Sequence, residues 1–255
     1  MDQATPPDAR PDAPADSRLR ALVGRIAAAA PLREPGADLS QLSAAPGALA
    51  AVPDAGLVTD AESGGLALVG ADLSRARMEE ADLSGANLRG ASLTGAVGRP
   101  PRCTGAIPRW AAHHEADLSG ADFTGIVAGQ VKFAGAMLED ARFGEAAMRF
   151  ADLSGALLDG TDFAGADLWG ADFSGADADD TVFRGARLDE AKLADANLTH
   201  ADFAEASLTK ASLAGSRLRG AHFTGAKLDG ADLSGADLSD TDLVRLNLAA
   251  CRLRH

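Results

Sequence analysis

Cysteine, histidine and paired carboxylates are the side chains of this sequence that could do chemistry. Cys103, His113 and His114 lie in one short stretch, but no second cysteine or carboxylate stands at a ligand spacing for zinc. Asp179 and Asp180 are adjacent carboxylates, yet acid–base catalysis needs a pocket that shifts a pKa, and the sequence predicts none there. No serine has histidine and aspartate partners in a recognised catalytic arrangement. We therefore predict that the chain is not an enzyme and holds no metal or cofactor.

A five-residue repeat carries these side chains and is clearest in residues 151–175, which read ADLSG ALLDG TDFAG ADLWG ADFSG. The same frame runs from Ala71 to His255 and gives 37 units, with Leu, Phe or Met third in 31 of them and Ala first in 28. Residues two apart on an extended strand point to the same side, so these two positions are predicted to face the core. Glycine is frequent at the fifth position, which indicates a turn with a positive φ.

The number of units in one coil follows from six phenylalanines that recur every twenty residues. This spacing predicts that four units close one coil and that the rings stack down a single wall. With coils about 4.8 Å apart, residues 71–255 would form an all-β, four-sided, right-handed parallel β-solenoid of about nine coils. The phenylalanines are Phe123, Phe143, Phe163, Phe183, Phe203 and Phe223.

The unit A-[DN]-[LF]-[ST]-G resembles the repeat of the pentapeptide-repeat proteins. The resemblance covers about 185 of the 255 residues and implies a right-handed, four-sided β-helix. Most members of that family have no known activity. The best-understood members resemble B-form DNA in size and charge, bind type II topoisomerases such as DNA gyrase, and protect them from quinolones or peptide toxins. Other bacterial members are found near secretion systems, which suggests an adaptor beside a secreted effector.

The first seventy residues do not follow the repeat. Residues 1–16 contain four prolines and are predicted to be a disordered tail. Residues 17–30 predict an amphipathic helix, which could cover the open N-terminal end of the solenoid, bind a partner, or lie on a membrane surface. Residues 31–70 are predicted to be a linker that ends in a degenerate first coil. The apolar residues of the helix recur at the spacing of one face: Leu19, Leu22, Val23 and Ile26.

The repeat is interrupted in residues 97–115. Proline cannot donate to a hydrogen-bond ladder, so this stretch is predicted either to loop out or to form an irregular coil. Because the interval from Ala96 to Glu115 is twenty residues, later units stay on the same walls. Some gyrase-protecting members of the family carry a loop that their function needs. The core positions of the interruption hold Gly98, Cys103, Pro108 and His113.

The composition narrows the choice of partner and compartment. The formal net charge is −13 at pH 7, which disfavours contact with phosphates, so we expect no direct binding of nucleic acid. Cys103 and Cys251 lie too far apart along the rod to form a disulfide, which suits a reducing compartment. No stretch is typical of a signal peptide or long enough to span a membrane. We expect a cytoplasmic protein without a membrane segment.

One predicted wall is acidic. The twenty-residue period places seven carboxylates on its outward positions and no lysine or arginine among them. Seven charges over four coils correspond to about one per 2.7 Å, against about one per 1.7 Å of axis for duplex DNA. This wall could mimic DNA or could be an ordinary solvated face of an Asp-rich repeat. Its acidic residues are Asp117, Glu139, Asp140, Asp159, Asp177, Asp179 and Asp180.

The opposite wall carries the only two tryptophans of the chain at positions that are not core positions. Exposed aromatic and arginine side chains on one face have the composition of a protein-interaction hot spot. The alternative is that Trp110 folds under the loop while Phe150 and Trp169 cover one another. The predicted partner-binding residues are Arg109, Trp110, Arg149, Phe150 and Trp169, with Arg89 on the same wall.

The last units replace the small first residue by Leu246 and Cys251, which predicts an enlarged apolar end with unpaired strand edges. Such an end could form a homodimer through Leu246, Leu248, Cys251 and Leu253. For the whole chain we predict an interaction scaffold or adaptor that binds another protein through its walls. The alternative is an acidic mimic of B-form DNA that binds DNA gyrase.

Overall fold

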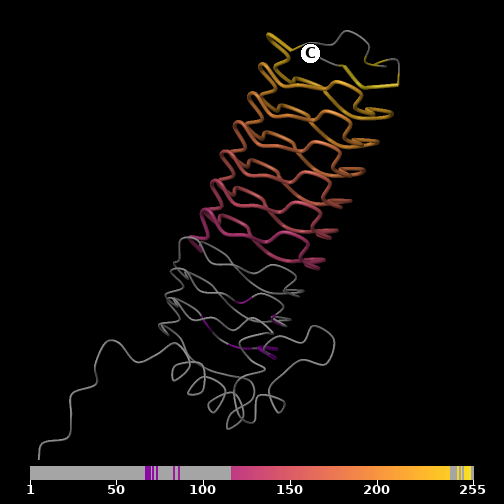
Figure 1. The fold of residues 1–255 in the computed structure, drawn as a ribbon. Helices are drawn as coiled ribbons and strands as arrows, with labels where there is room; N and C mark the ends of the chain where they lie inside the picture. The colour runs from indigo at the N-terminus through magenta and orange to yellow at the C-terminus, as the bar shows by residue number, and fades with distance from the viewer. Residues whose placement is uncertain are drawn as a thin grey trace, which may run out of the picture.

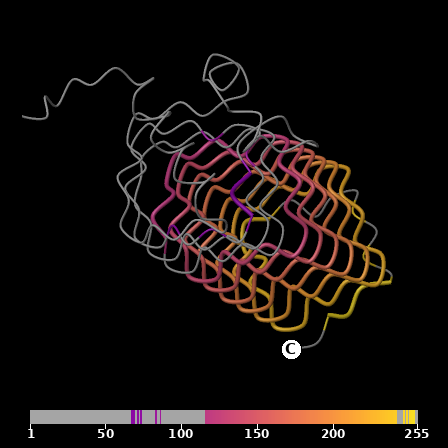
Figure 2. The same cartoon turned by 90° about the horizontal axis from the view of Figure 1, so that it is seen from below.

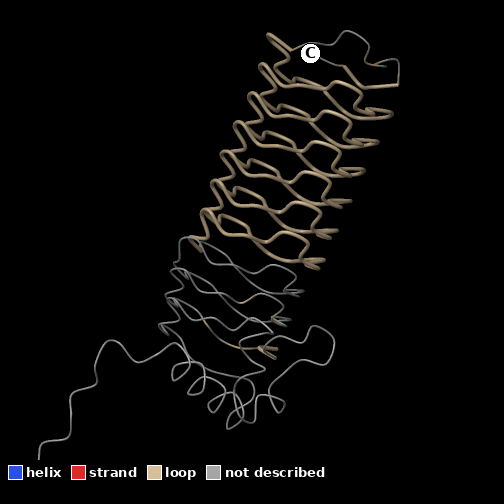
Figure 3. Cartoon of the chain, in the orientation of Figure 1, coloured by secondary structure: helices blue, strands red, loops and turns tan. Residues whose placement is uncertain are grey.

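A computed structural model of the chain describes residues 67–69, 71, 73, 83, 86, 116–241, 246, 248 and 250–253. Residues 116–241 wind into a stack of coils that lie over one another along a rod (Figures 1 and 2). These described residues contain no helix and no strand longer than one residue, so Figure 3 draws them throughout as loops and turns. The rod is nevertheless a β-solenoid, because its coils pair by parallel β-bridges.

Successive coils are joined at the second residue of every unit. Asp117 bridges Met137, Met137 bridges Leu157, and Leu157 bridges Asp177, each time in parallel and twenty residues apart. The Met137 N–H donates to the Ala116 carbonyl at 2.9 Å, and the Leu118 N–H donates to the Met137 carbonyl at 2.9 Å. The same pair of bonds recurs on all four sides. The prediction that four units close one coil is therefore confirmed.

A tight turn follows each bridged residue. The Ala121 N–H donates to the Leu118 carbonyl at 3.0 Å, and this bond from a first residue to the preceding third residue recurs along the rod. Every fifth-position residue from Gly120 to Asp240 has a φ between 51° and 74°. A positive φ at the third residue of a four-residue turn is typical of type II turns, as the frequent glycine at this position predicted.

Aspartate at the second position has a structural role in this turn. In nine units of 116–241 the Oδ1 of this aspartate accepts the backbone N–H of the fourth residue; the Ser154 N–H, for example, donates to Asp152 at 3.2 Å. Such a bond holds the start of the turn in place, as Asx turns do elsewhere. These nine of the 37 acidic residues of the chain therefore have a structural role in the turns.

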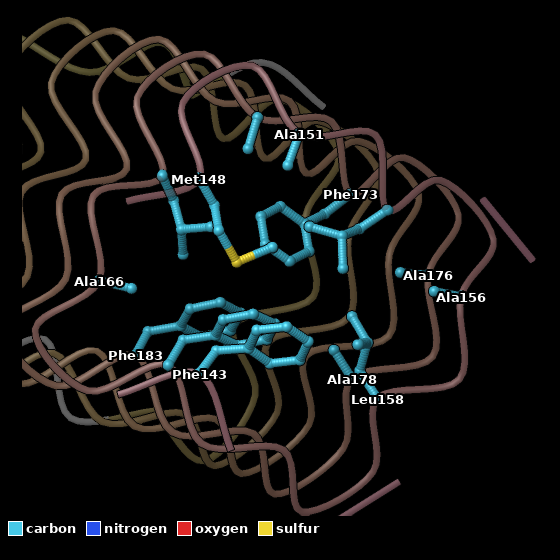
Figure 4. Packing of buried hydrophobic residues seen from close by; sticks show 14 of the residues in the cluster. Phe143, Met148, Ala151, Ala156, Leu158, Ala166, Phe173, Ala176, Ala178 and Phe183 are labelled. Carbon is cyan, nitrogen blue, oxygen red and sulfur yellow. The ribbon is translucent and has the colours of Figure 1, made fainter. Parts of the chain in front are cut away.

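The core is a column of stacked rings (Figure 4). From Phe123 to Phe223, neighbouring rings of one wall have centroids 4.9–5.4 Å apart and lie within 12° of parallel. Phe173 reaches in from the opposite wall and meets Phe163 edge-on, with centroids 5.7 Å apart. The predicted phenylalanine column is confirmed.

Departures from the repeat inside the core remain well packed. Ile126 and Val131 enlarge two small positions beside Ala128, and all three are fully buried, so the smaller core residue makes room for the larger neighbours. Thr161 and Thr181 replace alanine and are also buried. Each hydroxyl donates at 2.8 Å to a carbonyl of the previous coil, which removes the cost of burying an unpaired polar group.

The N-terminal predictions fall mostly outside the described residues. These are the tail at 1–16, the helix at 17–30, nearly all of the linker at 31–70, and the interruption at 97–115. Where residues of the early frame are described, they fit it: Leu68, Leu73 and Leu83 are buried third-position residues. No helix within the described part of the chain is long and apolar enough to cross a membrane.

The stacked rings generate the first testable prediction. We expect Phe163→Ala to lower the free energy of unfolding by about 3–5 kcal/mol, because the cavity would lie between two stacked neighbours and could not collapse. Phe163→Leu is the matched control, since leucine fills third positions elsewhere in the rod, and it should cost less. Thermal and denaturant melts of both variants measure the difference. An alanine variant that melts with the parent would refute the packing.

Candidate protein-interaction surfaces

The twenty-residue coil sorts the outward residues of 116–241 onto four walls, named here by their contents. The acidic wall has the core residues Leu118, Leu138, Leu158 and Ala178; the phenylalanine wall has Phe123 to Phe223; the tryptophan wall has Met148, Leu168 and Leu188; and the fourth wall has Phe133, Leu153 and Phe173. Because each bridged column repeats at twenty, residues at the same position of one wall lie above one another. Side chains from distant units thereby form continuous surfaces.

Three side chains meet on the tryptophan wall. The Arg149 guanidinium carbon lies 4.8 Å from the centre of the Trp169 ring, in the range of a cation–π contact. The Phe150 ring meets Trp169 edge-on, with centroids 4.6 Å apart and planes at 79°. The structure thus places Arg149, Phe150 and Trp169 together, as their spacing in the sequence predicted. Trp169 is half-buried by its two neighbours, whereas Phe150 remains 49% exposed.

Phe150 stands in a conformation that is unfavourable for its side chain. Its φ is 58°, in the left-handed region that glycine usually occupies at this position. The residue one coil above is Gly170, and a Cβ there would come within 2.8 Å of the Phe150 ring. The missing side chain of Gly170 therefore provides the space in which the ring of Phe150 lies.

Asp167 holds the base of this cluster. Its Oδ1 accepts the Trp169 backbone N–H at 3.3 Å, which fixes the turn that presents the indole. Its Oδ2 lies 3.8 Å from Arg149 and 3.9 Å from Arg187, so one carboxylate faces two guanidinium groups. Asp167 thus holds the backbone of Trp169 and places a negative charge beside Arg149.

Arg109 and Trp110, the other two residues predicted for this surface, lie outside the described residues, as does Arg89. The participation of all five partner-binding residues in binding stays a prediction.

On the acidic wall, the predicted carboxylates do line one face. The Ser119 hydroxyl lies 2.9 Å from both the Asp117 and the Glu139 carboxylates and can donate its one hydrogen to either, and the Asn197 amide donates to Asp177 at 2.7 Å. The carboxylates of Asp117, Glu139 and Asp177 thus have hydrogen-bond donors within the wall.

The centre of the wall is electrostatically strained. Slight desolvation and the negative charges of Asp179, Asp180, Asp140 and Asp177 raise the pKa of Asp159 above its ordinary value, although its side chain is exposed. In a folded protein this means that like charges have gathered without enough counter-charge.

Two features of this wall were missed by reasoning from charge alone. Met137 and Leu157 occupy neighbouring second positions in its middle, and Leu157 is 39% exposed. Beyond Asp180 the excess of negative charge ends, because Arg217 and Arg219 are exposed there and balance Asp237 and Asp240; Arg219 pairs with Asp240 at 3.0 Å. The signal was present in the sequence, since both aliphatic residues stand where Asp is common.

One cluster has the composition of a metal site. Asp179, Asp180 and His200 each offer a ligand atom, and these atoms all lie within 4.8 Å of one another. The His200 Nδ1 lies 3.5 Å from Asp179 and 3.8 Å from Asp180. Asp180 and His200 are exposed and Asp179 is half-buried. The cysteine and histidines of the interruption lie outside the described residues.

The residues predicted for a dimer end are placed as follows. Leu246, Leu248 and Cys251 are partly buried and pack against the core, whereas Leu253 is 52% exposed. The Cys251 thiol donates to the Leu228 carbonyl at 3.1 Å, and burial together with the charge of Asp229 raises its pKa. The predicted homodimer stays a prediction.

Comparison with known proteins finds two matching family descriptions. One, "Pentapeptide repeat region", matches residues 158–233; the other, "Pentapeptide repeats (8 copies)", matches residues 67–97, 114–149 and 216–254. No curated protein matches the chain.

Several solved structures are similar to the chain. HetL, a pentapeptide repeat protein involved in heterocyst differentiation regulation in the cyanobacterium Nostoc sp. strain PCC 7120, is 31% identical over 73% of this chain and 84% of its own, with a TM-score of 0.48. QnrB1, a plasmid-mediated fluoroquinolone resistance protein, is 19% identical over 73% of this chain and 91% of its own, with a TM-score of 0.38. A pentapeptide repeat protein of the Arabidopsis thaliana thylakoid lumen is 32% identical over 50% of this chain and 72% of its own, with a TM-score of 0.26.

The charges of the walls predict opposite changes in melting temperature for two aspartate substitutions. The pKa of Asp159 is raised in the folded state, so ionisation of this carboxyl lowers the stability of the fold. The loss of stability is complete at a pH above the folded pKa and absent at a pH below the ordinary value of 3.8. We expect Asp159→Asn to raise the melting temperature at pH 7 and to lose this advantage as the pH falls below about 4.

Asp172 supplies the opposite case. Burial raises its pKa, but hydrogen bonds from Ser174 and Lys192 outweigh burial and hold the pKa below its ordinary value. The ionised Asp172 carboxylate therefore stabilises the fold at a pH above its ordinary pKa, and this stabilisation is lost as the pH falls through the folded pKa. Asp172→Asn should lower the melting temperature at pH 7, and the difference from the parent should shrink in acid. Shifts of the same sign in both variants would contradict this account.

Proposed function

Because the chain belongs to the pentapeptide-repeat family, we propose that it is a non-enzymatic, right-handed β-solenoid that binds another protein through its tryptophan wall. The family supplies the scaffold and leaves the partner open, since fold alone does not determine function. The argument for this surface therefore rests on the side chains that depart from the repeat.

Phe150 is the observation that carries the proposal. A bulky residue with φ of 58° costs about 1–2 kcal/mol relative to glycine, which fourteen of the fifth positions from 120 to 240 use. Its ring is 49% exposed, so it also leaves apolar surface in water. Contact with Trp169 returns about 0.5–1.5 kcal/mol in addition to the burial of the covered half of the ring, and the two together offset the backbone cost. The exposed half of the ring gains nothing from the fold, and a partner that covers it would account for its exposure.

The neighbours of Phe150 suit an interaction hot spot. Arginine, tryptophan and aromatic side chains carry most binding energy in protein interfaces, above all where they are held rigid. Arg149 lies over the indole of Trp169, Phe150 meets the same ring edge-on, and Asp167 pairs with Arg149 from below, so the three side chains restrict one another before binding. A partner with an apolar pocket flanked by a carboxylate would match these groups.

The test is capture of partners with tagged protein from a lysate of the source organism. Phe150→Ser with Trp169→Ser should remove the partner that the parent captures, at a cost of about 2 kcal/mol or more per anchor. The matched control is Glu145→Ser with Asp195→Ser, which changes fifth-position residues on the phenylalanine wall and the fourth wall and should leave capture intact.

Stability separates a binding residue from a packing residue. Phe150→Gly removes the backbone strain as well as the ring contact, so its melting temperature should stay close to that of the parent while capture is lost. A large fall in melting temperature with capture retained would show that the ring serves the fold, and the proposal would fail.

A second candidate is that the acidic wall mimics B-form DNA and acts on DNA gyrase. The clustered carboxylates around Asp159 favour it, because their mutual repulsion resembles that of a phosphate backbone. The aliphatic pair Met137 and Leu157 and the basic residues Arg217 and Arg219 interrupt the resemblance.

A supercoiling assay with purified gyrase decides this second candidate. Inhibition or protection by the parent that disappears when Asp159, Asp177, Asp179 and Asp180 are changed to Lys would support it. The same number of reversals on the phenylalanine wall should matter less. If the parent has no effect on supercoiling, the DNA-mimic function is excluded whatever the variants do.

A further inference from the structure

We propose that the acidic wall is a docking surface for a cationic amphipathic helix, with Met137 and Leu157 as its apolar contacts and the surrounding carboxylates as its charged rim. This inference is independent of the tryptophan wall, which lies on the other side of the coil. It concerns a partner segment that presents aliphatic and basic side chains together.

The aliphatic pair stands at second positions, ten of which hold aspartate among the twenty-five units of 116–240. At the second position, aspartate accepts the N–H of the fourth residue in nine units, and neither methionine nor leucine can accept that bond. Met137 and Leu157 are directly bridged, so they form one continuous apolar strip across two coils. Leu157 is one of only two large hydrophobic residues of 116–241 that are exposed, the other being Phe150.

Carboxylates surround this strip. Asp140 and Asp159 are exposed beside it, and Asp177 is exposed directly above Leu157 in the same column. No lysine or arginine occupies the outward positions of this wall between Asp117 and Asp180. The wall therefore offers a hydrophobic centre with a negative rim, which a partner of purely positive charge would use only in part.

The spacing of the coils matches the pitch of an α-helix. Coils repeat at about 4.8 Å and a helix advances about 5.4 Å per turn, so a helix lying along the rod places roughly one turn on each coil. Apolar residues at i, i+3 or i+4 and i+7 would then follow the strip of Met137 and Leu157. Lysine or arginine on both flanks of that stripe would face Asp140, Asp159 and Asp177.

Duplex DNA offers no equivalent of the aliphatic strip, and this sets the two uses of the wall apart. A surface that only imitates phosphates would gain from a carboxylate at position 157. A surface that docks an amphipathic helix would lose its apolar contact there, even though the wall became more negative.

The experiment measures binding of a fluorescein-labelled, 18-residue synthetic peptide of Leu and Lys with leucines at i, i+3, i+4 and i+7, by anisotropy against the full chain. Met137→Asp with Leu157→Asp should weaken binding about tenfold, although it adds two negative charges. Val182→Asp is the matched control, because it adds a charge at a second position of the phenylalanine wall, and it should leave binding unchanged. A peptide with serine in place of leucine should bind weakly to the parent.

Three results would overturn the proposal. These are no binding of the Leu–Lys peptide to the parent, equal or tighter binding by the Met137→Asp, Leu157→Asp variant, and an equal loss in Val182→Asp. Asp159→Asn with Asp177→Asn should also weaken binding and should make it less sensitive to salt. Thermal melts of each variant establish that it is folded, and chelator in the buffer removes any contribution from a cation at Asp179, Asp180 and His200.

Discussion

The hydrogen bond that closes the turn of each five-residue unit is the constraint on which the rest of this structure depends. The first residue of a unit donates to the third residue of the unit before it, and this geometry is coupled to a positive φ at the intervening fifth residue. Repeated four times, the turn brings the chain back above its starting point, and the second residue then bridges its counterpart twenty residues on. Core columns, surface columns and the square section all follow from this one turn.

Such a constraint makes the core of this fold unusually predictable from sequence. Phe143 and Phe163 could be placed in one stack because the period of the turn fixes which residues overlie each other, with no need to predict long-range packing. Arg149 and Trp169 could be brought together for the same reason. Sequence patterns were silent on how far Trp169 would be buried, because burial depends on the rotamers that Phe150 and Arg149 adopt. The strip of Met137 and Leu157 was not predicted, because the acidic wall was defined by its charged residues and both of these residues are neutral.

The repeat also changes how the acidic composition should be interpreted. Asp152 and its equivalents accept hydrogen bonds from the turn that follows, so they would be present whatever the protein binds. Asp159 differs, because it stands exposed at a fourth position, and slight desolvation and neighbouring negative charges raise its pKa. Net charge therefore says little about function here. The informative carboxylates are those outside the second position, and the informative apolar residues are those that replace aspartate within it.

The bridging of residues twenty apart has a consequence for how such a rod can change during evolution. An insertion of one five-residue unit would leave every turn intact but would rotate all later units by a quarter of the coil, so that a surface spanning the insertion would be split between two walls. Duplication of a whole coil would lengthen the rod and keep every wall in register. The repeat thus tolerates growth in steps of twenty residues, and a binding surface such as that of Arg149, Phe150 and Trp169 is preserved only if length changes within it respect that step.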